Sequence, residues 1–140
     1  MRVSNIFLTV DIVLFKRIQD RFSVLLIQRK NEPYKLCWAL PGGYVDDNEN
    51  PDDAAVRELF EETNIQASLQ QLRVFGKPNR DPRGHVVSVA YIGLVDNSTQ
   101  ALAADDALKA CWFDIIDLPQ LAFDHDEIIK FALQKHSTVL

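Results

Sequence analysis

The stretch GGYVDDNENPDDAAVRELFEETNI, residues 42–65, decides the fold of this chain. It opens on a glycine pair and becomes acidic: residues 43–62 hold eight Asp or Glu side chains and one Arg. Asn50 and Pro51 mark a helix start, because Asn caps the first backbone amides and Pro suits the first helical position. Asn64 follows at the position where a helix end favours a left-handed backbone, which Asn tolerates. We therefore predict a helix over residues 51–63.

Three glutamates on this helix, Glu58, Glu61 and Glu62, are three or four residues apart and lie on neighbouring parts of one side. A water-exposed acidic face is the simplest interpretation. However, like charges four residues apart cost a helix about 0.2–0.5 kcal/mol each, and few basic residues are near. Mg²⁺ would neutralise them, because it takes carboxylate oxygens and shares its other positions with substrate phosphates. The glycine pair supports this second interpretation, since it lets backbone groups approach a metal or phosphate.

Apolar alternation predicts strands on both sides of this helix. Residues 6–15 carry apolar side chains on both faces and predict a buried central strand, paired in a hairpin with residues 22–30. Further strands are expected near residues 72–75, 85–95 and 110–115. A closing helix is expected over residues 124–135, with a capping box formed by Asp124 and Glu127 and an apolar face of Ile128, Phe131 and Ala132. Two separated helices among strands predict an α/β or α+β sandwich with helices on both faces of a mixed sheet. The buried stripe of the acidic helix is expected to comprise Ala55, Val56, Leu59 and Phe60.

Composition narrows the class of protein. The 140 residues fit one domain, residues 1–140, and 47% of them are hydrophobic, which is enough for a core. A net charge of -5 disfavours a nucleic-acid partner. The absence of a run of about 18 apolar residues predicts no membrane span. Cys37 and Cys111 are expected to be free, reduced thiols of a cytoplasmic protein. Zinc-ligand spacing and the common glycine-rich phosphate loops are absent.

The acidic stretch resembles the signature of the Nudix hydrolases, GX5EX7REUXEEXGU with U aliphatic. Gly43, Glu49 and the run Arg57 to Ile65 match it, except that Asn64 replaces a glycine. The resemblance implies an α/β/α sandwich with a mixed β-sheet. It also implies an enzyme that uses Mg²⁺, or Mn²⁺, to split a nucleoside diphosphate linked to another moiety.

The resemblance also assigns roles by position. Glu58 and Glu62 would be the main metal ligands, and Glu61 a further ligand or water contact. Arg57 would orient the glutamates, with Glu49 as its partner. The carbonyl oxygen of Gly43 is a candidate extra ligand. A metal-bound water of lowered pKa would then attack phosphorus.

The flanking segments NRDPRGHVVSVAYIGLV and AADDALKACWFDIIDLP are similar to those of bacterial ADP-ribose pyrophosphatases. This similarity implies hydrolysis of ADP-ribose to AMP and ribose 5-phosphate. One alternative is a MutT-type pyrophosphohydrolase of oxidised or other nucleoside triphosphates. Another is an ADP-ribose-sensing module without catalysis, as in regulators that carry a DNA-binding winged helix after a Nudix domain. The acidic chain, its end soon after the closing helix and its complete set of glutamates favour an enzyme. Such relatives are commonly dimers, but the first strand suits either an interface or a core, so a homodimer stays open.

Several residues outside the signature are candidates for the site. Arg80 and Arg83 suit bidentate phosphate contacts, although they also fit surface charges of a loop. Asp105 and Asp106 are candidates for a catalytic base or a metal contact, or belong to a solvated turn. Asp11 is expected to be a hydrogen-bonded structural residue. Two remaining groups are assigned to structure rather than chemistry: His125 at a helix start, and Trp38 and Trp112 in the core.

Overall fold

The computed structural model describes the backbone of residues 2–139 and the side chains of residues 2–135. Within this range the chain forms one sheet and two helices. The strands are β1 (Ile6–Ile18), β2 (Arg21–Arg29), β3 (Trp38–Ala39), β4 (Gly42–Tyr44), β5 (Gln70–Phe75), β6 (His85–Val95) and β7 (Ala107–Asp114). The helices are α1 (Pro51–Thr63) and α2 (His125–Val139).

The sheet is mixed, as predicted. Its order is β3-β2-β1-β6-β5, and in addition β4 pairs with β1 and β7 pairs with β2. The central pair β1 and β6 is parallel, whereas the other pairs are antiparallel. The expected hairpin is the β1–β2 pair. The short pairing of Asp11 with Gly42 and of Val10 with Gly43 brings the glycine turn against the middle of β1.

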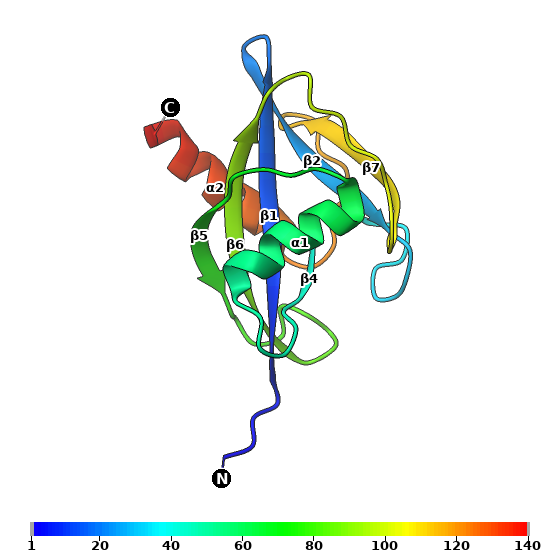
Figure 1. Cartoon of the computed structure of the whole chain (residues 1–140), viewed down its shortest axis with the longest axis vertical. Coiled ribbons are helices and arrows are strands. Elements are labelled where there is room, and N and C mark those ends of the chain that lie inside the picture. Colours follow the sequence, from blue (N-terminus) through cyan, green and yellow to red (C-terminus); the bar gives the residue numbers. More distant parts are fainter. Residues whose placement is uncertain (1, 140) are drawn as a thin grey trace.

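The two helices lie on opposite faces of the sheet, with α1 across one face and α2 across the other (Figure 1). One core cluster joins Ala54, Ala55 and Leu59 of α1 to β1, β2 and β6. A second joins Ile128, Ile129 and Ala132 of α2 to the other side of the same strands. Burial on both faces explains why the middle of β1 is apolar almost throughout. The predicted sandwich is confirmed.

Two expectations about burial are wrong. The first residues of β1, Ile6 to Leu8, are exposed, because the helices cover only the middle of the sheet. On α1, Val56 and Phe60 are also exposed. The helix is turned so that Ala54, Ala55, Leu59, Glu62 and Thr63 face inward. The buried face of α1 therefore contains the Glu62 carboxylate, whereas Val56 and Phe60 lie outside it.

The start of α2 also differs from the expected capping box. The Glu127 amide donates to the backbone carbonyl of Asp124, not to its side chain. The Asp124 carboxylate instead accepts two hydrogen bonds from Arg80. A long-range ion pair has thus replaced the local cap.

Among the described residues, no helix is long and apolar enough to cross a bilayer.

Candidate active site

Helix α1 begins and ends on local sequence signals. The Asn50 side chain accepts a hydrogen bond from the Asp52 amide at 3.0 Å, and Pro51 occupies the first turn. Asn64 has φ 62°, and its amide donates to the carbonyl of Phe60 at 2.8 Å. Asn64 therefore adopts the left-handed conformation expected of the family's glycine. The helix is therefore continuous from Pro51 to Thr63 and includes all three glutamates.

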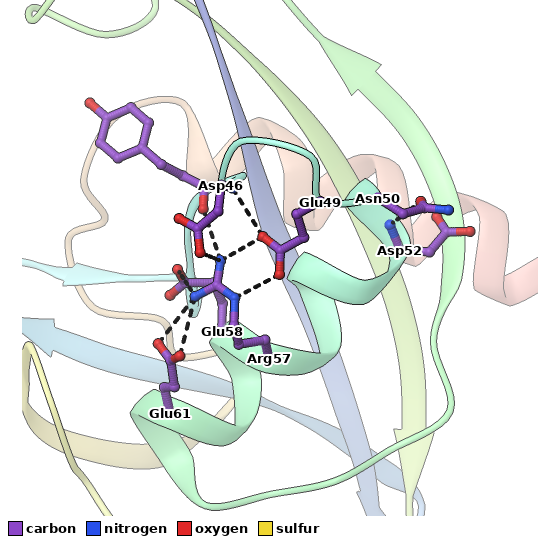
Figure 2. Close-up of polar contacts among 8 residues, drawn as sticks. Asp46, Glu49, Asn50, Asp52, Arg57, Glu58 and Glu61 are labelled. Atoms are coloured by element: carbon purple, nitrogen blue, oxygen red, sulfur yellow. Dashed lines mark hydrogen bonds and ion pairs between the residues drawn. The ribbon is translucent and has the colours of Figure 1, made fainter.

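Arg57 is the centre of an ion-pair network on the outer side of α1 (Figure 2). Its guanidinium donates to both carboxylate oxygens of Glu49, at 2.8 and 2.9 Å. It also donates to Glu58 at 3.0 Å and to Glu61 at 3.2 Å, and it reaches the Tyr44 carbonyl. The hydrogen bond with Arg57 lowers the pKa of Glu49 to about 2, and the same bond raises the pKa of Arg57. One planar fork thereby joins the preceding loop to two glutamates.

The other side of the acidic stripe turns inward. The exposed side-chain fractions of Glu61 and Glu58 are 40% and 14%, and Glu62 is 6% exposed overall. Burial raises the pKa of Glu62 to about 8 and that of Glu58 to about 7. The Gly42 amide partly opposes this effect at Glu62, because it donates to Oε1 at 2.8 Å. The site therefore holds two carboxylates whose ionised forms are costly in the protein alone.

The glycine pair is required by close packing. A Cβ on Gly42 would lie 2.1 Å from the Val10 carbonyl oxygen, and a Cβ on Gly43 would lie 2.6 Å from the Glu58 carboxyl. At Gly42 the neighbour is backbone, so there is no space for a side chain, whereas a Cβ on Gly43 would require the Glu58 carboxylate to move. The approach of Gly42 and Gly43 to the carboxylates places backbone groups where a bound cation would meet them.

The donor set fits a hard divalent cation. Among the described residues, no three His, Cys, Asp or Glu side chains converge in metal-ligand geometry, and Glu58 and Glu61 bind Arg57 instead. Even so, two largely buried carboxylates with raised pKa values stand beside a backbone turn. A cation would offset the burial cost of both. Oxygen donors of this kind are those that Mg²⁺ and Mn²⁺ take.

A cavity of about 240 Å³ opens beside the inner glutamate. Part of its wall is acidic, formed by Asp11, Glu62 and Asp106. Another part is basic, formed by Arg29, Arg80 and Arg83. A cavity lined by carboxylates, arginines and the rings of Tyr44 and Phe123 suits a ligand that carries phosphates and a metal together.

The two predicted phosphate-binding arginines differ in setting. Arg80 is 4% exposed and binds Asp124 through two hydrogen bonds of 2.9 and 2.6 Å, so it is not a surface charge. Arg83 is half-exposed, pairs with Asp81, and lies over the ring of Tyr44 at 5.4 Å. Both line the cavity. Their binding role stays a prediction, and Arg83 is the more accessible of the two.

The loop with Asp105 and Asp106 is held against the end of α1. The Ala104 amide donates to the carbonyl of Glu62 at 3.1 Å, and the Leu102 amide donates to that of Thr63. Both aspartates are exposed, and Asp106 lines the cavity, whereas Asp105, with φ 57°, does not. The structure thus brings Asp106 to the cavity, and the roles of both residues stay predictions.

Sequence reasoning missed Arg29 as a candidate site residue. Arg29 ends β2, donates to the Pro33 carbonyl at 2.7 Å and faces the ring of Phe123 at 5.1 Å. Burial lowers its pKa, and the nearby Arg83 lowers it further. A basic pair at a strand end, Arg29-Lys30, was the only local signal.

The structural interpretations of the remaining side chains are confirmed. Asp11 is buried and accepts a hydrogen bond from Ser88. Trp38 and Trp112 pack against the two main core clusters. Cys37 and Cys111 are free and half-buried. Of these side chains, Asp11 also lines the cavity.

Comparison with known proteins agrees with this geometry. The NUDIX domain model matches residues 6–132. The chain belongs to the Nudix family. It is 49% identical over 114 residues to an ADP-ribose pyrophosphatase of Methanocaldococcus jannaschii, covering 81% of this chain and 67% of that protein. It is 35% identical to the ADPR responsive transcriptional repressor NtrR of Acinetobacter baylyi, over 91% of this chain but only 53% of the repressor.

Solved structures give the same family. A MutT/nudix family protein of Enterococcus faecalis matches with a TM-score of 0.90 and 36% identity, covering 96% of this chain and 63% of that one. The NUDIX domain of Shewanella oneidensis NrtR, complexed with ADP ribose, matches with a TM-score of 0.88 and 33% identity. That match covers 95% of this chain and 90% of the other. Together with the M. jannaschii relative, the family supports a pyrophosphohydrolase.

Proposed function

We propose that this Nudix protein hydrolyses ADP-ribose to AMP and ribose 5-phosphate with Mg²⁺, and that Mn²⁺ can replace Mg²⁺. The observation that carries the proposal is the cavity whose lining brings Glu62 together with Arg29, Arg80 and Arg83. A diphosphate shared between a cation on the glutamates and these arginines has its charge compensated by both. The M. jannaschii relative, an ADP-ribose pyrophosphatase, supports the choice of substrate.

The residues proposed to hold the metal are Glu58, Glu61, Glu62 and the carbonyl of Gly43. When bound, the cation supplies charge for the bridging phosphates and a water of lowered pKa. Arg57 keeps Glu58 and Glu61 in place through its bonds to both and to Glu49. The Gly42 amide orients Glu62. These contacts fix the carboxylates in the metal-free protein, and binding of the cation would require Glu58 and Glu61 to turn from Arg57 toward it.

The arginines that line the cavity are the candidates for substrate binding. Arg83 and Arg29 are proposed to bind the diphosphate or the terminal ribose, whereas Arg80 is held by its two hydrogen bonds to Asp124. Hydrolysis forms one bond from the water oxygen to phosphorus and breaks the bridging P–O bond, whose oxygen leaves with a proton. Asp105, Asp106 and Glu61 are the candidate bases for the water proton. Of the two aspartates, Asp106 is the one that lines the cavity.

A substrate panel tests the proposal directly. Purified protein is incubated with Mg²⁺ or Mn²⁺ and one substrate at a time: ADP-ribose, other nucleoside diphosphate sugars, dinucleotides, or nucleoside triphosphates including an oxidised one. The release of AMP, phosphate and pyrophosphate is measured. The expected result is the highest kcat/KM for ADP-ribose. Preference for a triphosphate with release of pyrophosphate would reject this substrate.

Two other functions have support among the relatives. A putative 8-oxo-dGTP diphosphatase of Bacillus subtilis is 41% identical over 70 residues, which is 49% of this chain and 45% of that protein. The NtrR match supports an ADP-ribose sensor without catalysis. Mg²⁺-dependent turnover together with the absence of a DNA mobility shift would exclude the sensor. A cytoplasmic location and a homodimer remain expectations.

A further inference from the structure

His125, the first residue of α2, lies under the turn between β3 and β4. Its side chain is 5% exposed, and its Nδ1 accepts a hydrogen bond from the Leu40 amide at 3.0 Å. A ring nitrogen that accepts a hydrogen bond carries no proton, so the proton of the neutral ring is on Nε2. Burial lowers the pKa of His125, which keeps the ring in this neutral form. The ring thus serves the turn as a hydrogen-bond acceptor.

The turn that begins at Leu40 carries both glycines that meet the glutamates. Leu40 is buried and lies two residues before Gly42, whose amide donates to Glu62 at 2.8 Å. The next residue, Gly43, packs so closely against Glu58 that an added methyl group would displace the Glu58 carboxylate. A displacement of Leu40 would therefore shift Gly42 and Gly43, and with them the positions of the Glu62 and Glu58 carboxylates.

The other ring nitrogen of His125 faces Asp11 of β1. Nε2 lies 3.4 Å from Asp11 Oδ1, while Ser88 donates to Oδ2 of the same carboxylate. Asp11 is itself paired with Gly42 along β1 and β4. The two ring nitrogens therefore face groups on two different elements, which leaves the buried ring one orientation.

The segment before α2 supports the same turn. The Ala122 amide donates to the Trp38 carbonyl at 2.8 Å, and Leu121 forms a parallel bridge with Trp38. The His125 amide in turn donates to the carbonyl of Ala122 at 3.2 Å. The chain from residue 121 to 125 thus runs beside residues 38 to 40 and delivers the imidazole to the Leu40 amide.

We propose that His125 is a positioning residue, which sets the Gly42–Gly43 turn for cation binding by Glu58 and Glu62 through its bond from the Leu40 amide. The inference rests on the metal site of the proposed function. His125 acts through the turn because its contacts go to Leu40 and Asp11 and not to a glutamate. Loss of a direct partner of a metal ligand typically weakens metal binding 10- to 100-fold, and because His125 acts one step further out, we expect the lower end of this range, about 10-fold.

Two substitutions separate the two ring nitrogens. In His125→Asn, the amide oxygen takes the place of Nδ1 and accepts from Leu40. In His125→Gln, the longer side chain brings an amide nitrogen to the place of Nε2 and leaves the Leu40 amide unpaired in a buried site. Mn²⁺ binding is measured on substrate-free protein by calorimetry and electron paramagnetic resonance, and folding is measured by circular dichroism and thermal unfolding. His125→Asn should stay within about threefold of the wild-type Kd, whereas His125→Gln should weaken Mn²⁺ about 10-fold.

A control uses His85, another histidine whose ring contacts the backbone. His85 Nε2 lies 3.2 Å from the Gly76 carbonyl, at the start of β6 and away from the glutamates. His85→Asn should leave the Mn²⁺ affinity unchanged. A merely structural role of His125 would lower the melting temperature and leave the Mn²⁺ affinity of the folded protein unchanged.

The outcomes separate this inference from the function on which it rests. Equal Mn²⁺ affinity in the wild type and both His125 variants would overturn the inference and leave the metal site intact. Equal weakening in both variants would also overturn it, because the bond from Leu40 would then not be the determining contact. Failure of the wild-type protein to bind Mn²⁺ would reject the proposed metal site and the inference together.

Discussion

Replacement of Glu62 by Gln is expected to stabilise the metal-free protein while abolishing its response to Mg²⁺. Gln keeps an oxygen that accepts from the Gly42 amide, so the local geometry is preserved. It removes the charge whose burial raises the pKa of Glu62 from 4.5 to about 8. Because one pKa step corresponds to about 1.4 kcal/mol, that charge costs the folded protein up to about 5 kcal/mol above pH 8.

The dependence on pH has a definite sign. The folded pKa of Glu62 is above the unfolded one, so between pH 4.5 and 8 the folded protein binds more protons. The free energy of unfolding of the metal-free wild type should therefore fall as pH rises through this window. Glu58, whose pKa is raised to about 7, adds a fall in the lower part of the window. The Gln variant should lose the part due to Glu62.

Thermal unfolding in EDTA at pH 5 and pH 8 measures this effect. We expect the Glu62→Gln variant to exceed the wild type at pH 8 by about 2–5 kcal/mol, or roughly 3 °C per kcal/mol for a domain of this size. At pH 5 the two proteins should be nearly equal. Added Mg²⁺ should raise the melting temperature of the wild type at pH 8 and leave that of the variant unchanged. A variant that keeps the wild-type fall with pH, or keeps most Mg²⁺-dependent turnover, would refute the reasoning.

Three further substitutions test other parts of the site. Arg57→Lys loses the planar fork that joins three carboxylates, so kcat for ADP-ribose should fall at least about 10-fold while the fold persists, as checked by steady-state kinetics and circular dichroism. Gly43→Ala places a methyl group 2.6 Å from the Glu58 carboxyl, so it should weaken Mn²⁺ binding about 10-fold in calorimetry. Gly76→Ala, whose added methyl group has its nearest contact at 3.3 Å, should leave the Mn²⁺ affinity unchanged. Equal affinities of the two variants would contradict the close-packing argument. Arg29→Gln should raise KM for ADP-ribose about 10-fold with little change in kcat, and an unchanged KM would remove Arg29 from the substrate wall.

The sequence alone determined the acidic helix and its caps. The side chain of Asn50, the ring of Pro51 and the left-handed backbone of Asn64 act within a few residues, so their spacing is sufficient to predict them. The same holds for the position of Glu58, Glu61 and Glu62 on one side of the helix. The alternation in residues 85–95 likewise predicted β6, because a strand that packs on both faces shows its pattern locally.

Only the tertiary structure decided how the helix is turned and what meets it. The apolar pattern could not show that Val56 and Phe60 face water while Glu62 is buried, since that depends on the fit of α1 against the glycine turn. Likewise Asp124 matches a local cap in sequence, yet it pairs with Arg80, 44 residues away. His125 reaches Leu40 across 85 residues. Such contacts form where segments distant in sequence meet in the packed fold. Local spacing in the sequence cannot predict them, because they depend on the register of the strands and helices, which packing determines.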